Sequence, residues 1–408
     1  MACPHANSVF YLPIAAISIA ARVSSSNLRV LQTVQTLNPE TGGVARTVIS
    51  LSKGLQQHGL QIEIVAMDKP ESPWLRDQSL TVHALGPGLT RYRYSRALPK
   101  WLKEQGDKFD CVIVHGIWQH HSFAVWQRFH KTAVPYFVFP HGMLDPWFKR
   151  TFPLKHLKKW LYWPWADYRV LRDAAAVIFT SEEERCRARQ SFWLYRAKEK
   201  ISPLGIEEPR LAGPEARLLF LAKFPEIEKM RMLLFLGRIH PKKGCDLAID
   251  ALPRHASGEP VSLLIAGPDQ VGWTRQLRER VARMDVPPHV TFAGMLEGPL
   301  KRGAFENADA FILPSHQENF GMSVIEALSF GVPVLISDRV NIWREIAADH
   351  AGYVEPDDLA GTTRLIERWL HTSPDEQNLL RVNARNCFLR RFEINRAAGS
   401  LLAILQAK

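Results

Sequence analysis

Short apolar segments alternate with amphipathic segments along most of the chain, from Leu28 to about Glu393. Each apolar segment is a continuous run of Val, Ile, Leu and Phe, which is typical of strands covered on both faces. Helical periodicity follows in between, for example over residues 43–58, 244–252 and 320–330. This order predicts parallel, doubly wound α/β sheets. The expected strands are residues 28–37, 60–67, 111–115, 136–140, 175–180, 232–237, 261–267, 289–294, 310–314 and 333–337.

The alternation falls into two sets, which are separated by a segment rich in Pro and Gly, residues 202–230. That composition favours a connection between domains. A chain of 408 residues is long enough for two cores of ordinary size. We expect an extension over residues 1–27, Rossmann-like domains over 28–204 and 205–390, and a C-terminal helix over 391–408.

The N-terminal extension contains an uncharged apolar stretch, residues 8–21. The stretch is shorter than the roughly 20 residues that span a bilayer. It also lacks the basic start of a secretory signal, and Pro13 interrupts it. Two interpretations remain: a disordered extension or misassigned start, and a peripheral membrane anchor. No other stretch of the sequence predicts a membrane span.

Charge is distributed unevenly between the two halves. Residues 1–204 hold 27 Lys and Arg against 15 Asp and Glu, whereas residues 205–408 hold 25 against 26. The basic half is therefore expected to meet an anionic surface or substrate. A nucleic-acid-binding protein is the alternative from another class, but no helix-turn-helix, RNP-type or zinc-finger signature is present. The 5 scattered cysteines form no CxxC pair, which favours reduced thiols in a cytoplasmic protein and disfavours a zinc site.

Two glutamates, Glu318 and Glu326, flank the end of an expected strand and the start of the next helix. Open α/β sheets bind ligands beyond the carboxyl ends of their strands, where helix N-termini present free N–H groups. Val324, Ile325 and Leu328 form the buried stripe of that helix, so Glu326 lies off the stripe. Both carboxylates can accept hydroxyl hydrogens from one sugar or ribose. Two solvated glutamates would give the same spacing, so the strand-end context carries this hypothesis.

A basic turn, Gly237-Arg238-Ile239-His240-Pro241-Lys242-Lys243-Gly244, follows another strand. Arg238 and Lys243 can neutralise a diphosphate and stabilise it as it leaves, without a divalent metal. A plain surface turn is the alternative. The dipole of the next helix disfavours a cation at that position, which favours a bound anion.

Three further strand ends carry candidate ligands. Gly42 and Gly43 follow the first strand and allow the backbone to approach a ligand closely, although many such pairs are only turns. His141 follows the strand that ends at Pro140, and His115 ends the strand before it. We expect His141 to contact the donor sugar and His115 to lie on the acceptor side, while His120 and His121 look like incidental surface residues.

These motifs resemble the retaining glycosyltransferases of group 1, also called family 4, of the kind used in surface polysaccharide biosynthesis. The resemblance runs from about Leu28 to the C-terminus and is most specific over residues 235–333. It implies the GT-B fold, in which two Rossmann-like domains face each other across a cleft. Two positions depart from the commoner family patterns: Leu204 stands where many relatives have Asn before this Gly, and Ala266 begins a turn that is more often G-x-G-P.

The resemblance also implies roles for individual residues. Glu318 would contact the donor sugar, Glu326 the ribose, and Arg238 with Lys243 the diphosphate. Residues near Met295 would line the base. The remaining implied ligands are the glycine loop Gly42 and Gly43, the active-site His141, and the backbone of Asn319, Phe320 and Gly321.

The implied activity is hexosyl transfer, with retention, from a UDP- or GDP-sugar to a glycan or lipid-linked acceptor. We expect no cofactor, no metal and no nucleic-acid partner. No carboxylate stands out as a covalent nucleophile, so a front-side displacement is expected. Another GT-B activity, a phosphorylase or a nucleotide-sugar epimerase, is the nearest alternative.

The segment of residues 146–172 combines basic and aromatic side chains. Such a mixture suits the headgroup region of an anionic membrane. The alternative is that the aromatic side chains pack inside the domain and the lysines are solvated. The residues concerned are Trp147, Phe148, Trp160, Trp163 and Trp165 with Lys149, Arg150, Lys155, Lys158, Lys159, Arg169 and Arg172.

Overall fold

The computed structural model describes residues 28–76, 79–151, 153–209, 214–253 and 260–407. The chain divides into two compact units, residues 1–202 with 398–408 and residues 203–397. The expected extension over residues 1–27, and with it the question of a peripheral anchor, lies outside the described residues. No helix within the described ranges is both long and apolar enough to cross a membrane.

The first unit contains a parallel sheet of seven strands in the order β3-β2-β1-β4-β5-β6-β7. Every strand pair is parallel, so the carboxyl ends of β1, β4 and β5 meet at one edge. The strands are β1 (Arg29–Val34), β2 (Gln61–Ala66), β3 (Thr81–Ala84), β4 (Cys111–His115), β5 (Tyr136–Phe139), β6 (Ala176–Phe179) and β7 (Glu199–Ile201). The helices are α1 (Gly43–Gln57), α2 (Ala97–Gln105), α3 (His120–Phe129), α4 (Trp147–Thr151), α5 (Pro153–Tyr162), α6 (Asp167–Asp173) and α7 (Glu182–Ala188).

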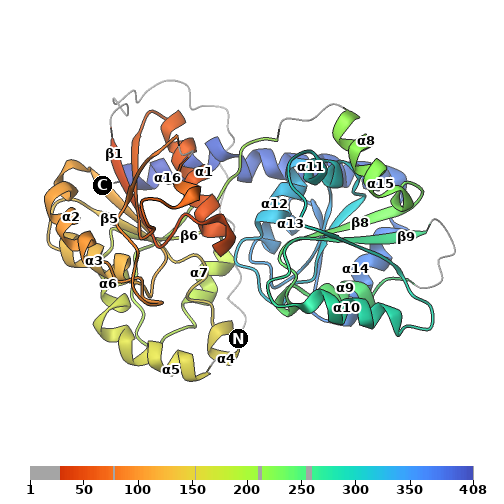
Figure 1. The fold of residues 1–408 in the computed structure, drawn as a ribbon, viewed down its shortest axis with the longest axis horizontal. Coiled ribbons are helices and arrows are strands. Elements are labelled where there is room, and N and C mark those ends of the chain that lie inside the picture. The colour runs from red at the N-terminus through yellow and green to blue at the C-terminus, as the bar shows by residue number, and fades with distance from the viewer. Residues whose placement is uncertain (1–27, 77–78, 152, 210–213, 254–259, 408) are drawn as a thin grey trace. The chain divides into compact units, whose positions relative to one another are not determined.

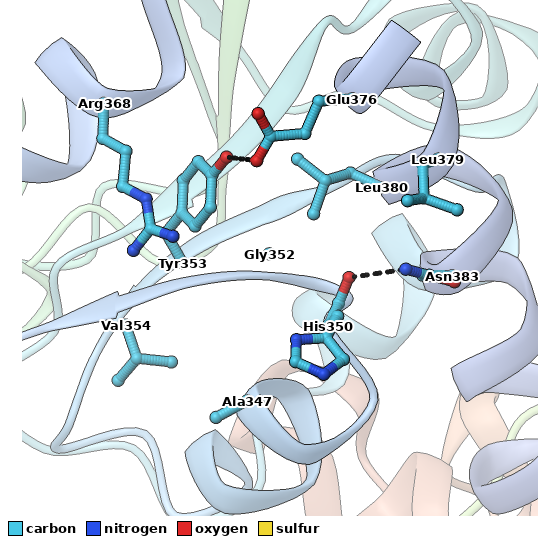
Figure 2. A pocket seen from close by; sticks show the side chains of 10 residues that line it. All are labelled: Ala347, His350, Gly352, Tyr353, Val354, Arg368, Glu376, Leu379, Leu380 and Asn383. Atoms are coloured by element: carbon cyan, nitrogen blue, oxygen red, sulfur yellow. Dashed lines mark hydrogen bonds between the residues drawn. The ribbon is translucent and has the colours of Figure 1, made fainter. Parts of the chain in front are cut away.

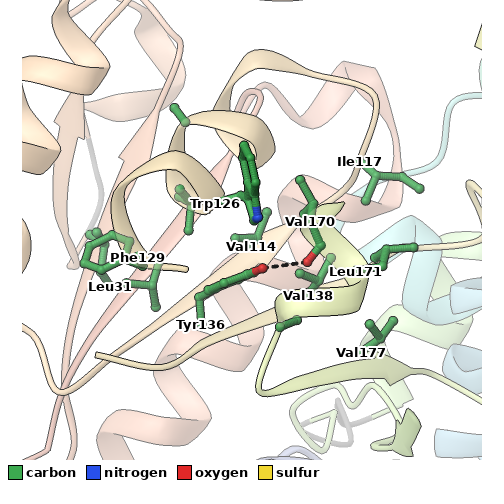
Figure 3. Packing of buried hydrophobic residues seen from close by; sticks show 14 of the residues in the cluster. Leu31, Val114, Ile117, Trp126, Phe129, Tyr136, Val138, Val170, Leu171 and Val177 are labelled. Atoms are coloured by element: carbon green, nitrogen blue, oxygen red, sulfur yellow. Dashed lines mark hydrogen bonds between the residues drawn. The ribbon is translucent and has the colours of Figure 1, made fainter. Parts of the chain in front are cut away.

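The core of this unit lies between the sheet and the helices α2, α3 and α6 (Figure 3). Val114 and Val138 of the central strands pack against Trp126 of α3. The hydroxyl of Tyr136 donates a hydrogen bond of 2.7 Å to the carbonyl of Val170 in α6 (Figure 3). On the other face, Val48 of α1 packs in a smaller cluster with side chains of β1 and β2. Helices on both faces confirm the predicted doubly wound architecture.

The second unit contains a parallel sheet of six strands in the order β10-β9-β8-β11-β12-β13. Figure 1 labels two neighbouring strands of this sheet, β8 and β9. Its central strands are buried along most of their length, as their continuous apolar sequences predict. The strands are β8 (Arg231–Leu236), β9 (Val261–Ala266), β10 (His289–Gly294), β11 (Ala310–Leu313), β12 (Val334–Ser337) and β13 (Gly352–Glu355). The helices are α8 (Pro214–Lys223), α9 (Cys245–Asp250), α10 (Trp273–Ala282), α11 (Gly298–Asn307), α12 (Met322–Ser329), α13 (Trp343–Ala348), α14 (Leu359–His371) and α15 (Pro374–Cys387). The last helix, α16 (Ile394–Gln406), begins in the second unit and continues from Ala398 as part of the first.

The sequence pattern missed three strands, β3, β7 and β13, and each of them is an edge strand. Their sequences, TVHA, EKI and GYVE, contain no continuous apolar run because an edge strand is covered less completely than a central one. The connecting segment of residues 202–230 also differs from the expectation, because it contains α8. Ala216 and Phe220 of α8 are buried and lie so close to α11 that a Cβ atom on Gly303 would meet the Ala216 carbonyl at 2.2 Å.

Candidate active site

The basic turn after β8 lies against the end of β11. Gly244 has a φ of 70°, and a Cβ atom there would meet the Pro314 carbonyl at 2.2 Å. The Lys242 carbonyl accepts hydrogen bonds from the backbone of His316 at 2.9 Å and from the hydroxyl of Ser315 at 3.0 Å. Because β8 and β11 are neighbouring parallel strands, the two sequence motifs come together at one edge of the sheet.

Lys243 and Glu318 form an ion pair at this edge. Lys243 is buried and Glu318 is half-buried, whereas Arg238 is exposed. Burial raises the pKa of Glu318, but the charge of Lys243 and the hydrogen bond that it donates outweigh burial, so the net shift is downward. The charges of Lys242 and Arg238 add to the lowering. Glu318 is therefore held as a carboxylate inside a cluster of cations.

The backbone of Glu318 is fixed by the loop that follows β12. Its N–H donates to the Arg339 carbonyl and its carbonyl accepts from the N–H of Asn341, both at 3.0 Å. The Asn341 amide donates a further bond of 3.3 Å to the Asn319 side chain. Three successive strand-end loops, those after β8, β11 and β12, thus hold one carboxylate in place.

Helix α12 begins at Met322, two residues later than the sequence pattern suggested. Its N-cap is Gly321, whose φ of 80° puts it in the left-handed region that favours glycine. A Cβ atom there would approach Val324 at 3.1 Å and Val340 at 3.3 Å. Phe320 is buried beneath the turn. The N-terminus of α12 therefore follows closely after Glu318 in the chain. The free N–H groups of that helix end are suited to binding an anion.

Glu326 lies one turn into α12 and pairs with Lys301 of α11 at 2.6 Å. Both side chains are half-buried. Lys301 could not be predicted from the sequence, because a lysine in an amphipathic helix carries no motif that sets it apart. Met295, after β10, has an exposed side chain, as a residue that lines a base would need.

The glycine loop of the first unit follows β1. Asp68 holds this loop by accepting a bond of 2.8 Å from the N–H of Leu37. Gly42 has a φ of 122° and is the N-cap of α1, which begins at Gly43. A Cβ atom at Gly42 would meet nothing within 4 Å, so backbone conformation and not crowding requires glycine here.

His115 ends β4, and His141 lies two residues after the end of the neighbouring strand β5. The two rings are hydrogen-bonded to each other, His115 Nδ1 to His141 Nε2, at 3.0 Å. His115 is buried and His141 is half-buried. Burial lowers the pKa of His141 to about 4 and, together with the neighbouring imidazoles, lowers that of His115 well below its usual value. Both rings are therefore neutral near pH 7. The Glu184 carboxylate accepts a bond of 2.6 Å from the N–H of Gly142 and so fixes the loop that carries His141.

The expectation that His120 and His121 are surface residues is wrong. Both are buried in α3. His120 accepts a bond of 3.1 Å from the N–H of Ser95, and His121 donates one of 3.0 Å to the His115 carbonyl. A sequence run of two histidines at a helix start does not reveal that the helix turns them toward the sheet.

No group of three or more His, Cys, Asp or Glu suited to a metal ion occurs in the part of the chain that the structure describes. A cavity of about 410 Å³ in the second unit is lined by β13 and by α13, α14 and α15. There the Tyr353 hydroxyl donates a bond of 3.1 Å to Glu376 (Figure 2). None of the strand-end residues described above lines this cavity.

Two family profiles match the chain. Residues 42–205 match the glycosyl transferase 4-like domain, and residues 219–386 match the glycosyl transferases of group 1. Together they cover the strand-end loops described above except most of the loop after β1, which lies before residue 42. The chain belongs to the group 1 glycosyltransferases. It is therefore an enzyme.

Curated relatives agree with this assignment. The enzyme is 27% identical to the D-inositol 3-phosphate glycosyltransferase of Jonesia denitrificans over 59% of its own chain and 58% of the relative. It is 31% identical to the phosphatidyl-myo-inositol mannosyltransferase of Mycobacterium tuberculosis, over 43% of its chain and 47% of the relative. The enzyme thus spans less than two thirds of the length of both.

Solved structures show the same GT-B fold. The Anabaena protein HepE in complex with UDP and glucose matches with a TM-score of 0.71 at 15% identity, over 92% of the enzyme and 98% of HepE. WaaG, a glycosyltransferase involved in lipopolysaccharide biosynthesis, matches with a TM-score of 0.68 at 16% identity, over 93% and 100%.

The buried histidines predict that the stability of the enzyme falls as the pH falls from about 6.5 toward about 4. The pKa values of His115, His120, His121 and His141 are lowered on folding, mainly by burial, so these four side chains bind up to four more protons in the unfolded chain. Asp167 acts in the opposite sense by one proton, because burial raises its pKa to about 7. Thermal midpoints measured from pH 7 to pH 5 should therefore decrease. The decrease in thermal midpoint should be smaller in His121→Gln than in the wild type. His289→Gln, which changes an exposed histidine, is the control and should show the same decrease as the wild type. Equal decreases in the wild type and both variants would contradict the role of the buried histidines.

Proposed function

We propose that the enzyme transfers a hexosyl group, with retention and without a divalent metal, from a UDP- or GDP-sugar to a glycan or lipid-linked acceptor. The observation that carries the proposal is the pairing of Lys243 with Glu318 at adjacent strand ends, directly before the start of α12. Cations, a carboxylate and free helix N–H groups are the ligands that a diphosphate sugar requires.

Related proteins support a nucleotide-sugar donor. HepE has been solved with UDP and glucose. A second relative, 24% identical over 93% of the enzyme, is the GDP-mannose-dependent alpha-(1-6)-phosphatidylinositol dimannoside mannosyltransferase of Mycobacterium tuberculosis. The names of these two proteins include UDP in one case and GDP in the other, so UDP- and GDP-sugars are both candidate donors.

In the proposed reaction, the diphosphate replaces Glu318 as the ion-pair partner of Lys243. Arg238 supplies a second cation. Glu318, freed from its partner, accepts hydrogen bonds from the sugar hydroxyls. The bond between the anomeric carbon and the diphosphate breaks, and the acceptor oxygen bonds to that carbon on the same face. The acceptor proton passes to the departing phosphate oxygen. The two cations and the α12 N–H groups stabilise the charge that develops.

A donor screen tests the proposed function. Thermal shifts with UDP- and GDP-sugars should reveal one that stabilises the enzyme, because a ligand at a hundredfold its dissociation constant adds about 2.7 kcal/mol. Transfer of the sugar of that donor should continue in EDTA, since Arg238 and Lys243 supply the charge. Activity that EDTA abolishes and Mg²⁺ or Mn²⁺ restores would contradict the metal-independent mechanism. Consumption of free phosphate would indicate a phosphorylase instead.

Glu318→Gln and Glu326→Gln should impair different steps: the first should affect turnover, and the second should affect nucleotide binding. Loss of the Glu318 charge should lower kcat while free UDP or GDP binds as well as before, because Lys243 is then available to the diphosphate. Loss of the Glu326 charge should weaken binding of the free nucleotide about 10-fold or more, the value of a charge-assisted hydrogen bond to the ribose. Isothermal titration and initial rates separate the two effects. Glu367→Gln, an exposed carboxylate of α14, is the control, and equal effects of both site variants on nucleotide affinity would refute the division.

The hypothesis of a lipid-linked acceptor is based on an exposed apolar face of α5. Leu154, Leu157 and Leu161 are 79%, 55% and 63% exposed, and Trp160 is 41% exposed. Trp193 lies beside Trp160, with ring centroids 6.2 Å apart, and is 67% exposed. Apolar side chains gathered in this way mark an interaction surface.

Two residues of the expected membrane segment do not belong to this face. Trp163 is fully buried and stacks on Phe192 at 4.3 Å, so its assignment to the membrane boundary is wrong. Lys159 is half-buried over the Trp118 ring, 4.5 Å from its centroid. A helical stripe of aromatic residues does not reveal which of them face the core. The side chains of Phe148, Arg150 and Lys155 lie outside the described part of the structure.

We infer that the α5 face docks on the headgroup region of an anionic bilayer at the inner face of the membrane. Lys149 and Lys158 are exposed in this segment, and the first half of the chain has the basic excess. Each basic residue near anionic lipid contributes about 1 kcal/mol. One relative is named phosphatidyl-myo-inositol mannosyltransferase, and this name supports a lipid acceptor.

Sedimentation with phosphatidylglycerol-containing liposomes tests the docking. The enzyme should bind at low salt and dissociate at high salt, and Leu157→Glu with Leu161→Glu should abolish binding without unfolding, because both side chains are exposed. Leu218→Glu, at a leucine of α8 that is 63% exposed, is the control. If the enzyme ignores the liposomes, or if the double variant changes only the oligomeric state, the surface binds something other than a membrane.

A further inference from the structure

Four side chains of the first unit form a continuous hydrogen-bonded chain from α1 to His141. Ser52 of α1, Gln32 of β1 and His115 of β4 are fully or almost fully buried. The successive distances are 2.8 Å from Gln32 Nε2 to Ser52 Oγ, 2.7 Å from His115 Nε2 to Gln32 Oε1 and 3.0 Å from His115 Nδ1 to His141 Nε2. The family assignment gives no role to Ser52 or Gln32.

The direction of every bond in this chain follows from its first member. The Ser52 hydroxyl donates to the Val48 carbonyl at 2.7 Å, because a carbonyl can only accept. Ser52 Oγ has then used its one hydrogen and must accept from Gln32. The amide of Gln32 therefore directs its NH₂ group to Ser52 and its oxygen to His115.

The tautomers of both imidazoles follow in turn. Gln32 Oε1 accepts, so the hydrogen of His115 lies on Nε2 and Nδ1 has a free lone pair. The pKa of His115 is lowered well below its usual value by burial and then by His141 and His121, so the ring has only this one hydrogen near pH 7. His115 Nδ1 accepts from His141 Nε2. The one hydrogen of neutral His141 is thereby committed to His115, and its Nδ1 is left as an acceptor.

We propose that Ser52, Gln32 and His115 are positioning residues that fix the tautomer of His141, so that its Nδ1 accepts a hydrogen bond from a hydroxyl of the donor sugar. This proposal rests on the proposed function and on the sequence-based expectation that His141 contacts the donor sugar. An imidazole with the opposite tautomer would present an N–H group to that hydroxyl and could not accept from it. The chain of bonds therefore selects a ligand group that donates, such as a sugar hydroxyl, over a phosphate oxygen, which only accepts.

The backbone at His141 agrees with a fixed ring. Its φ of 51° lies in the left-handed region, which a histidine adopts only when its surroundings enforce it. The bond from the Gly142 N–H to Glu184 enforces it here. The ring also lies almost parallel to that of Phe139, at 16° and with centroids 5.6 Å apart.

Imidazole ¹⁵N spectra of the full chain, labelled at histidine, test the tautomer without reference to activity. The signals of His141 are identified by their loss in His141→Ala. Near pH 7 they should show Nε2 protonated and Nδ1 unprotonated. A protonated Nδ1, or an average of the two tautomers, would overturn the proposal.

Gln32→Glu separates positioning from packing. A carboxylate beside His115 should raise its pKa, and a protonated His115 donates from both nitrogens. His141 must then accept at Nε2 and move its hydrogen to Nδ1. The described titratable groups that oppose this change are His141 and His121. As the pH falls from 8 to 6, kcat of Gln32→Glu should decrease about 10-fold relative to wild type, the value of one hydrogen bond, while affinity for free UDP or GDP stays constant.

Thr33→Val is the matched control, because Thr33 is buried in the same strand and its hydroxyl has no hydrogen-bond partner among the described residues. Its pH profile should equal that of the wild type. A profile of Gln32→Glu that matches the control would refute the positioning role. If the spectra show the expected tautomer but His141→Ala turns over normally, the sugar contact is wrong. If no nucleotide-sugar is a donor, the proposed function fails and the spectra still decide the tautomer.

Discussion

The ion pair of Lys243 and Glu318 depends on the strand order of the second sheet. The two residues are far apart in sequence, and they meet because β8 and β11 are neighbours whose carboxyl ends lie at the same edge. A buried lysine without a partner would be strongly destabilising, so each member of the pair requires the other until an anion arrives. A diphosphate can replace the carboxylate without leaving the lysine unpaired. In the proposed reaction, the pair keeps both charges partnered until the diphosphate replaces the carboxylate.

In the first unit, polar side chains at the strand ends are satisfied by hydrogen bonds between neutral groups and not by an ion pair. Its strand-end side chains Gln32, His115 and His141 are uncharged near pH 7 and are satisfied by a directional chain of hydrogen bonds. A neutral network avoids the desolvation penalty of ions but fixes the direction of each bond. In the proposed reaction, the second unit supplies charge for the diphosphate, and the first supplies a defined hydrogen-bond pattern for the uncharged sugar.

Most of the central strands could be predicted from sequence, since β4 and β10 have the expected bounds and the others differ by a few residues at their ends. The edge strands could not, because β7 has the sequence EKI and contains no apolar run. The grouping of Arg238, Lys243 and Glu318 followed from their strand-end positions. Lys301 did not, because its contact with Glu326 joins two helices whose relative rotation no local pattern encodes. The burial of His121 and Trp163 was missed for the same reason.

Backbone strain occurs in the turns that follow two adjacent strands of the first sheet. Trp118 and His141 have φ values of 71° and 51°, and they follow β4 and β5. A left-handed conformation costs a non-glycine residue about 1–2 kcal/mol and persists only where contacts over-determine it. The Trp118 N–H donates to the buried Asp167 at 3.0 Å, and the Gly142 N–H donates to Glu184. Two buried carboxylates thus hold two strained turns at adjacent strand ends.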